Sequence, residues 1–252
     1  MSPRLSIPAV LLLWATTAAA WEIQRSEELA APAPLEAREV RAVQSGRSAE
    51  LHVISFPMKS HTFAVMDNPE GAFTLETAAQ KRGALAAVNG GYFHADRRPL
   101  GLVIRDGKEL HGQERAKLLS GIVAVRDGRV TLQRVAEFKP GAAVHEALQA
   151  GPFLIDAGKP VPGLNAARAA ARAIVFTDGK GRAGFILCRF TTLAETAEIL
   201  ATEGLLSGAR ITRALNLDGG SSTGLWLRSE PPHYLREHRD VRNYLAIVPR
   251  GK

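Results

Sequence analysis

Cysteine, aromatic residues and long apolar runs are scarce in this chain of 252 residues, and each shortage excludes a class of protein. The single cysteine, Cys188, cannot form an internal disulfide, so a disulfide-stapled scaffold is excluded. It lies in the apolar run AGFILCRF, which favours a buried, inert thiol. Aromatic residues make up 6%, but 46% of residues are apolar and 23% are charged. This ordinary globular composition excludes disordered, collagen-like and coiled-coil chains.

The first twenty residues are typical of an export signal. A basic start, an apolar run from Leu5 to Trp14 and the small residues Ala18–Ala20 indicate a cleaved secretory signal peptide. An uncleaved anchor is the alternative, but the run is shorter than the roughly 20 residues that a bilayer requires. We therefore predict a signal peptide over residues 1–20 and a periplasmic or secreted protein, with no stable membrane insertion after cleavage.

The net charge of +7 favours anionic partners such as phosphates and acidic glycans. The basic residues are dispersed, except in the segments RAAARA (168–173) and REHRDVR (236–242). Zinc-finger spacing, an aromatic RNA-binding motif and a basic helix are all lacking, so we expect no nucleic-acid partner. The sequence does not indicate an oligomeric state.

Short strands and two helices account for most of the chain. Residues 21–49 are polar and contain two prolines, and we interpret them as a tether or an irregular lead-in strand before a single domain over residues 50–252. The segments LVIRDGKEL, IVAVRDGRVTL and AIVFTDGKGRAGFIL each place Asp-Gly between apolar arms, which predicts antiparallel hairpins. We expect an α+β fold with a mixed, largely antiparallel β-sheet and flanking helices.

The two predicted helices both precede apolar strands that end at a glycine pair. TLETAAQKRG should end at Gly83, and TLAETAEILATEG should begin at a capping box formed by Thr192 and Glu195, with Gly204 as a possible end. The following strands lead into AVNGGYFH and LNLDGGSSTG. In both segments a polar side chain stands next to glycines, whose backbone lacks Cβ atoms and can therefore approach a ligand closely. The pair predicts one shared pocket.

Two further segments allow either a structural or a functional interpretation. Gln149 precedes the Gly-Pro of ALQAGPFLI, which could be only a rigid loop. Arg172 enters the apolar strand of ARAAARAIVF, where a partly buried guanidinium would need an acidic partner or an anionic ligand.

Taken in order, AVNGGYF, ALQAGPFLI, RAIVFTDGKGRAGFIL, TLAETAEIL, ALNLDGGSSTGLW and DVRNYLAIVP resemble the phosphodiester glycosidase domain family, over roughly residues 50–249. The resemblance implies a mixed β-sheet with flanking helices and hydrolysis of a sugar-1-phosphodiester. It implies catalytic roles for Asp218, Arg172 and Asn89. It also implies substrate contacts from other positions, namely Gly90, Gly91, Gln149, Gly219, Gly220 and Asn243. We predict a substrate contact from Ser221 as well. The sequence departs from the usual family pattern at Tyr92, Ala173 and Ser221.

Such a reaction develops positive charge at the anomeric carbon and negative charge on the departing phosphate. We hypothesise that ionised Asp218 stabilises the former or activates water, while Arg172 and the glycine pairs hold the phosphate. Asn89 would bridge a sugar hydroxyl and a phosphate oxygen. The expected partner is a phosphorylated carbohydrate or glycoconjugate.

Other chemistries fit the sequence less well. A serine nucleophile at Ser221 or Ser222 would need a G-x-S-x-G elbow, and a P-loop would need Gly-Lys-Ser/Thr. His94 and His111 lack metal-site spacing, and we predict neither a metal nor a cofactor. The alternative functions are a non-catalytic envelope module that binds a glycan or phosphoglycan, and an envelope scaffold.

Overall fold

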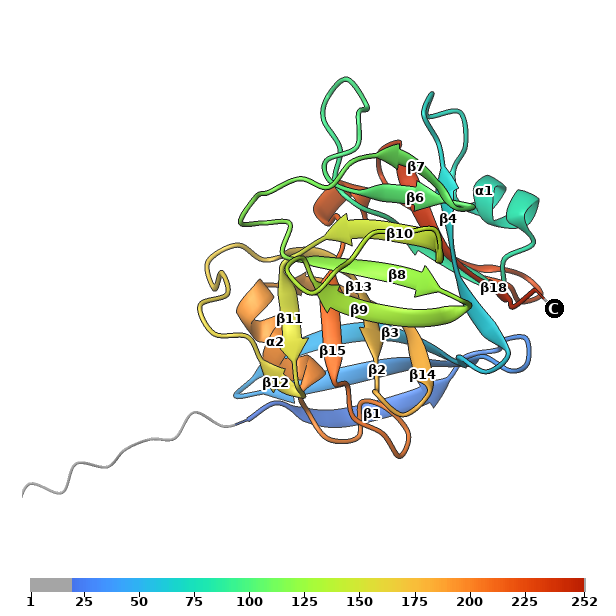
Figure 1. Cartoon of the computed structure of the whole chain (residues 1–252). Coiled ribbons are helices and arrows are strands. Elements are labelled where there is room, and N and C mark those ends of the chain that lie inside the picture. Colours follow the sequence, from blue (N-terminus) through green and yellow to red (C-terminus); the bar gives the residue numbers. More distant parts are fainter. Residues whose placement is uncertain (1–19, 252) are drawn as a thin grey trace, which may run out of the picture.

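The computed structural model describes residues 20–251, so the predicted signal peptide lies, except for its last residue, outside the described residues. These residues form three β-sheets and two short α-helices (Figure 1). Within residues 20–251, no helix has the length and apolar character to cross a membrane.

The large sheet has eight strands in the order β1-β2-β3-β14-β13-β15-β11-β12. Their bounds are β1 Glu22–Glu28, β2 Glu36–Gln44, β3 Arg47–Pro57, β14 Arg182–Thr191, β13 Ala170–Thr177, β15 Arg213–Asn216, β11 Phe153–Asp156 and β12 Lys159–Pro160.

Two five-stranded sheets complete the fold, with the orders β7-β6-β10-β8-β9 and β17-β16-β5-β18-β4. The first contains β7 Lys108–His111, β6 Val103–Arg105, β10 Val144–Ala150, β8 Gly121–Arg126 and β9 Arg129–Arg134. The second contains β17 His233–Leu235, β16 Leu225–Leu227, β5 Ala86–Asn89, β18 Asn243–Pro249 and β4 His61–Asp67.

All strand pairs given for the described residues are antiparallel, which confirms the largely antiparallel sheet, but the parallel pairs expected of a mixed sheet are lacking among these residues. The fold is also richer in strands than α+β with flanking helices suggests. The helix-to-strand units misled the prediction, because such units often build parallel sheets. Here the strands that follow the helices, β5 and β15, instead pair with antiparallel neighbours brought in from distant parts of the chain.

The N-terminal segment belongs to the folded domain. Residues 22–44, expected as a tether or lead-in strand, form β1 and β2, and β2 pairs with β3 over its whole length. Val40 and Ala42 are fully buried, and Trp21 donates a hydrogen bond to Glu198 of the second helix at 3.2 Å. The folded domain therefore begins well before Glu50.

The three Asp-Gly hairpins are confirmed as β6–β7, β8–β9 and β13–β14. In the first two, Asp and Gly both have positive φ, at 50° and 77° for Asp106 and Gly107 and at 48° and 71° for Asp127 and Gly128. This is the backbone of a type I′ turn, whose twist matches that of the flanking strands.

Both helices are confirmed, and their caps explain where they begin. Helix α1 (Leu75–Arg82) has Thr74 as its N-cap and ends at Gly83, whose φ of 69° is left-handed. Helix α2 (Leu193–Leu200) begins at the predicted capping box of Thr192 and Glu195. It ends before Gly204, because Ala201 is already its C-cap.

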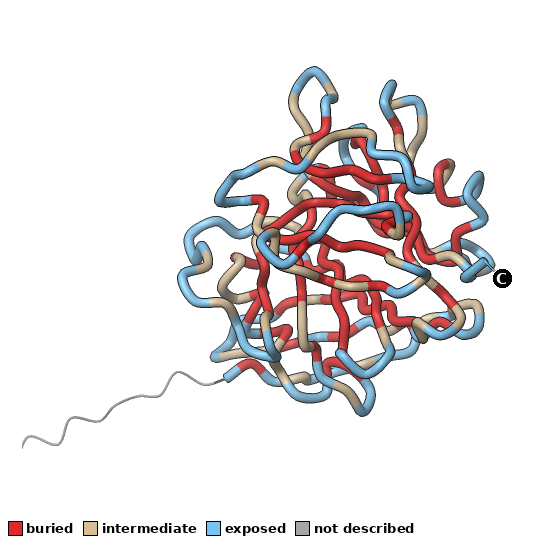
Figure 2. The backbone as a smooth tube through the Cα atoms, viewed as in Figure 1, coloured by how far each residue is buried: buried red, intermediate tan, exposed pale blue. Residues whose placement is uncertain are grey.

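Apolar side chains from all three sheets meet in the largest core cluster, which Figure 2 shows as buried chain running through the centre of the molecule. Phe63 of β4 stacks on Phe185 of β14 at 5.0 Å between ring centroids. A second cluster joins α2 to the large sheet. It contains Cys188, which is fully buried as predicted, and burial raises the pKa of its thiol to about 11.

Candidate active site

The two glycine pairs meet although they are far apart in sequence and belong to different sheets. We call residues 89–91, at the end of β5, the Asn89 corner, and residues 216–220, which begin at the last residue of β15, the Asp218 corner. The backbone N–H of Asp218 donates to the carbonyl of Gly90 at 3.0 Å. The side-chain amide of Asn89 donates to the carbonyl of Asp218 at 2.7 Å. The structure thus brings the predicted corners into direct contact.

Bare backbone is required in the Asn89 corner because β18 lies against it. A Cβ atom on Gly90 would lie 2.0 Å from Oδ1 of Asn243, well inside any real contact distance. The same Oδ1 accepts a hydrogen bond from the N–H of Gly91 at 2.8 Å, and the N–H of Gly90 donates to the Asn243 carbonyl at 2.9 Å. Asn243 is fully buried and holds this corner in place.

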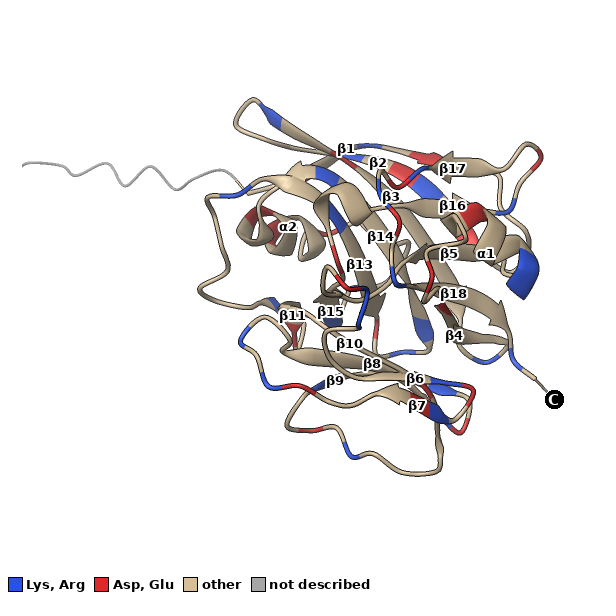
Figure 3. Cartoon of the chain, turned by 90° about the horizontal axis from the view of Figure 1, so that it is seen from above, with Lys and Arg blue, Asp and Glu red and all other residues tan. Residues whose placement is uncertain are grey.

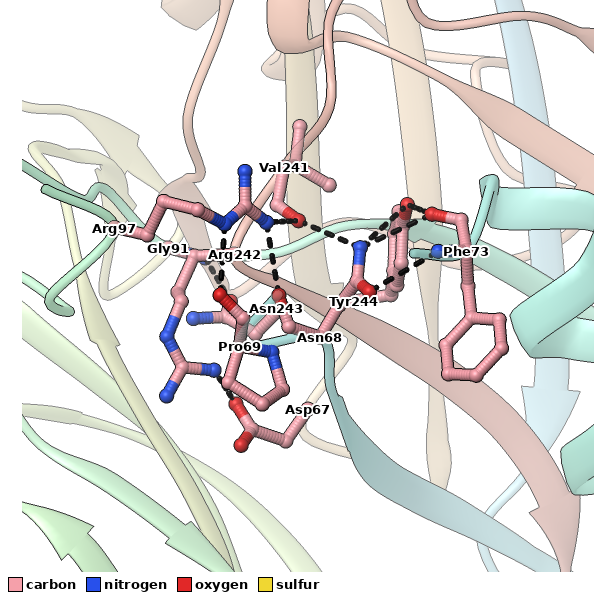
Figure 4. A network of polar contacts seen from close by, with 10 residues as sticks. All are labelled: Asp67, Asn68, Pro69, Phe73, Gly91, Arg97, Val241, Arg242, Asn243 and Tyr244. Atoms are coloured by element: carbon pink, nitrogen blue, oxygen red, sulfur yellow. Dashed lines mark hydrogen bonds and ion pairs between the residues drawn. The ribbon is translucent and has the colours of Figure 1, made fainter. Parts of the chain in front are cut away.

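A polar network supports Asn243 from behind (Figure 4). Arg97 donates to the carbonyls of Asn68 at 2.8 Å and Val241 at 3.0 Å, and Asn68 also donates to the Val241 carbonyl. Next to Val241, the guanidinium of Arg242 pairs with Asp67. These bonds fix the segment that leads into β18, and with it the Asn89 corner.

Asn89 does not have the exposed position that its hypothesised role requires. Its side chain is fully buried, its Nδ2 donates to the Asp218 carbonyl, and its Oδ1 accepts from the N–H of Gly224 at 3.2 Å. Both polar atoms of the amide therefore bond to the protein. In this geometry Asn89 joins the two corners, and the two polar atoms that the hypothesised bridge would use already have protein partners.

Asp218 is the only carboxylate of the two corners, and it is partly buried. Burial raises its pKa. Hydrogen bonds from the Ser222 hydroxyl and the Gly219 N–H, together with the charge of Arg239, oppose this rise. The Gly219 N–H lies 2.8 Å from Oδ1 of Asp218. Ser222 and Arg239 were not predicted as site residues, although Arg239 belongs to the noted basic segment REHRDVR.

Tyr92 links the Asn89 corner to the Asp218 corner from the other side. Its hydroxyl donates to the Gly151 carbonyl at 2.7 Å and accepts from the amide of Asn216 at 2.9 Å. Burial raises its pKa, the charge of Asp218 raises it further, and Arg172 opposes both effects. Tyr92 thus lies within electrostatic range of both predicted charged site residues.

Arg172 is half-buried at the start of β13, beside the Asp218 corner. Its Nε donates to the carbonyl of Thr191 at 3.2 Å and its Nη2 to that of Arg168 at 2.7 Å. A Cβ atom on Gly219 would lie 3.9 Å from its Nη1. Burial lowers its pKa, and within residues 20–251 it forms no ion pair. The acidic partner considered from the sequence is therefore missing among the described residues.

Gln149 acts on a neighbouring loop. It is buried, its Oε1 accepts from the N–H groups of Leu102 and Glu114, and its Nε2 donates to the Glu114 carbonyl at 2.7 Å. Its backbone carbonyl lies against Gly91. The side chain is thus occupied in positioning residues 112–120.

The remaining candidates differ in exposure. Gly220 has a left-handed φ of 63°, and its Cα faces open space, while Ser221 is exposed and Ser222 is buried. His111 contacts the carbonyl of Gly101. Among the described residues, no group of three or more His, Cys, Asp or Glu side chains could hold a metal ion. Figure 3 shows Lys and Arg spread over many elements.

Comparison with solved structures shows that the fold is shared. The catalytic domain of zebrafish N-acetylglucosamine-1-phosphodiester alpha-N-acetylglucosaminidase, auto-inhibited by its pro-peptide, matches with a TM-score of 0.66 and 18% identity over 92% of this chain and 89% of that one. A hypothetical protein from Synechocystis matches with a TM-score of 0.61 and 18% identity over 90% and 64%. A protein from Burkholderia pseudomallei, described as a candidate exported protein, matches with a TM-score of 0.51 and 14% identity over 80% and 74%.

Comparison by sequence gives the family. No curated protein matches the chain. The family described as phosphodiester glycosidase matches residues 82–248, which include both corners, Arg172 and Asn243. The protein therefore belongs to the phosphodiester glycosidase family.

Proposed function

We propose that this protein hydrolyses a sugar-1-phosphodiester in an exported glycoconjugate of the cell envelope or its surroundings. The observation that carries the proposal is the half-buried guanidinium of Arg172, which has no acidic partner among the described residues and lies beside the Asp218 corner. A half-buried cation without an acidic partner, next to bare backbone and a carboxylate, fits a ligand that has a negative phosphate and develops positive charge at its anomeric carbon.

Arg172 is assigned to the phosphate. Its Nη1 faces Gly219, while its Nε and Nη2 are fixed by backbone carbonyls, so the guanidinium is oriented before substrate arrives. The Gly219–Gly220 backbone offers close approach without a side chain. Orienting a cation in advance is effective because no reorganisation is needed as phosphate charge develops.

Asp218 is assigned to the anomeric carbon. As a carboxylate it stabilises the oxocarbenium-like centre or takes a proton from the attacking water. Water adds its oxygen to the anomeric carbon and loses a proton, and the electron pair of the bond from that carbon to the phosphate oxygen leaves with the phosphate. The products are a free sugar and a phosphomonoester. Asn89 and Asn243 contribute indirectly, because they position the two corners.

Substitution of Asp218 by Asn tests the assignment. The Asn side chain keeps an oxygen to accept the Gly219 N–H, so folding should be preserved while turnover falls by at least about a hundredfold. Asp127→Asn is the matched control, because Asp127 is an exposed hairpin residue with left-handed φ, which Asn tolerates. The assay offers a panel of sugar 1-phosphate methyl esters and measures phosphomonoester release. Undiminished activity in Asp218→Asn would remove this residue from the mechanism.

A binding module is the alternative function, and the same panel separates the two. An enzyme releases phosphomonoester, whereas a binding module is protected from thermal unfolding by the diesters without releasing product. Localisation in the periplasm or outside the cell is proposed from the N-terminal sequence, and recovery of the mature protein from the periplasmic or culture fraction tests it.

A further inference from the structure

A cavity of about 340 Å³ lies beside the Asp218 corner, between it and the ends of β13 and β14. Gly220 and Ser221 line one side, and Ala171, the neighbour of Arg172, lines another. Neither Asp218 nor Tyr92 is among the lining residues. Arg172 is not among them either, so the cavity adjoins the site through the backbone of Gly220, which is assigned to the phosphate.

A β-bulge shapes one wall of this cavity. Ala170 pairs with Thr191 and Arg172 with Cys188, so Arg189 and Phe190 of β14 together face the single residue Ala171. The extra residue gives Phe190 a φ of 55°, a left-handed backbone that is rare for a bulky side chain. Bulges redirect side chains, and this one turns Phe190 outward at the cavity.

Phe190 does not contribute to the core. Its exposed fraction is 80%, the larger of the two values for exposed large apolar residues in the described chain, and it lines the cavity. An exposed ring gains little from burial, and its left-handed backbone costs roughly 1 kcal/mol or more. Stability therefore does not account for this ring, and such strained positions cluster at ligand sites. A flat, fixed aromatic face is suited to the apolar face of a ring-shaped ligand.

The charges around the cavity are all of one sign. Arg189 and Arg236 line it, and neither forms an ion pair with any acid of residues 20–251. No Asp or Glu is among the lining residues. A cleft that has arginines and no carboxylates among its lining residues attracts and concentrates anions.

We propose that this cavity binds the group on the far side of the phosphate, and that this group is a negatively charged sugar. Its ring lies on Phe190, and its negative group is bound by Arg189 and Arg236. This inference rests on the proposed function, because it takes Arg172 as the phosphate ligand.

The test uses phosphodiesters that differ only beyond the phosphate. The sugar of the methyl ester cleaved best is esterified through its phosphate to glucose, glucuronic acid or glucose 6-phosphate. The glucuronic acid and glucose 6-phosphate diesters show whether the cavity prefers a carboxylate or a second phosphate. The KM of the wild type for at least one acidic diester should be about tenfold or more below that for the methyl ester. Phe190→Asn, which tolerates the left-handed backbone, should remove most of this advantage.

The paired substitution Arg189→Ala with Arg236→Ala should remove the preference for the acidic diesters over the glucose diester. Leu118→Asn is the matched control, because Leu118 is the other exposed large apolar residue of the described chain and does not line the cavity. It should behave as the wild type does. Equal KM values for all diesters in the wild type, or an unchanged ratio in Phe190→Asn, would overturn the inference while the proposed function stands.

Failure of the proposed function gives a different result, namely no cleavage of any diester by the wild type. Thermal unfolding then decides the inference, with diesters built on the sugar whose methyl ester stabilises the protein most. A stabilisation by an acidic diester that exceeds the one by the methyl ester, and that Phe190→Asn loses, would support the cavity as a binding site for acidic sugars. No such difference would overturn it.

Discussion

Adding one methyl group at Gly90 should damage both stability and activity, although alanine is the smallest possible change. The new Cβ would lie 2.0 Å from Oδ1 of Asn243 and 2.9 Å from its carbonyl oxygen. Both atoms belong to a fully buried residue, so the strain cannot be relieved by moving a side chain into solvent. Overpacking costs about 1–3 kcal/mol, and losing the bond from the Gly91 N–H adds about 1 kcal/mol. We expect Gly90→Ala to lower the free energy of unfolding by about 2–4 kcal/mol.

The loss of activity should exceed what unfolding explains. The Gly90 carbonyl accepts the N–H of Asp218, so displacing it moves the proposed catalytic carboxylate. Urea unfolding measures the first effect, and kcat of the folded fraction measures the second. Gly112→Ala is the control, because the nearest atom to its Cβ would lie at an ordinary 3.6 Å.

A double-mutant cycle identifies the contact responsible. In an Asn243→Ala background the Oδ1 atom is gone, so Gly90→Ala should cost at least about 1 kcal/mol less than in the wild type. If Gly90→Ala were as stable and active as the wild type, the argument that this corner needs bare backbone would be refuted.

Two predictions concern pH. Because Asp218 acts ionised and burial raises its pKa, kcat/KM should fall as pH drops through a value above the ordinary 3.8, and a pH–rate profile of the wild type checks this. Glu146 is buried, and burial raises its pKa to about 7 from 4.5, so the folded state binds its proton more tightly than the unfolded state. Its contribution to stability is therefore greatest below pH 4.5 and is lost, by up to about 3 kcal/mol, as pH rises through 7. Urea unfolding at pH 5 and pH 8 should show this loss, and Glu146→Gln should reduce it; equal pH dependence in both proteins would rule out Glu146 as its source.

Local sequence signals predicted the local structure well. The Asp-Gly hairpins and the helix caps depend on neighbouring residues, so the letters Asp106-Gly107 or Thr192 with Glu195 already contain the cause. The contact between the two corners was also predicted, although its support was a repeated pattern and a family resemblance, since no local signal specifies which strands meet.

The rest depended on tertiary packing. Nothing in a polar segment with two prolines indicates that β2 will pair along the whole of β3. Asn89 and Gln149 are polar residues near glycines, a pattern that suggests contact with a ligand. The same pattern occurs when such side chains bind backbone groups of the protein, as both do here. The bulge at Phe190 results from an unequal count of residues on two paired strands, which cannot be read from either strand alone.

The contact between the Asn89 and Asp218 corners also determines which property of the protein is lost first when the sheets move relative to each other. The carboxylate of Asp218 lies where the chain segments that follow β5 and β15, strands of two different sheets, meet, and a few hydrogen bonds between these segments set its position. A small shift of one sheet relative to the other would displace the carboxylate and stop catalysis while leaving every hairpin and helix intact. Loss of turnover would then be the earliest sign that the sheets have shifted, ahead of any change in secondary structure.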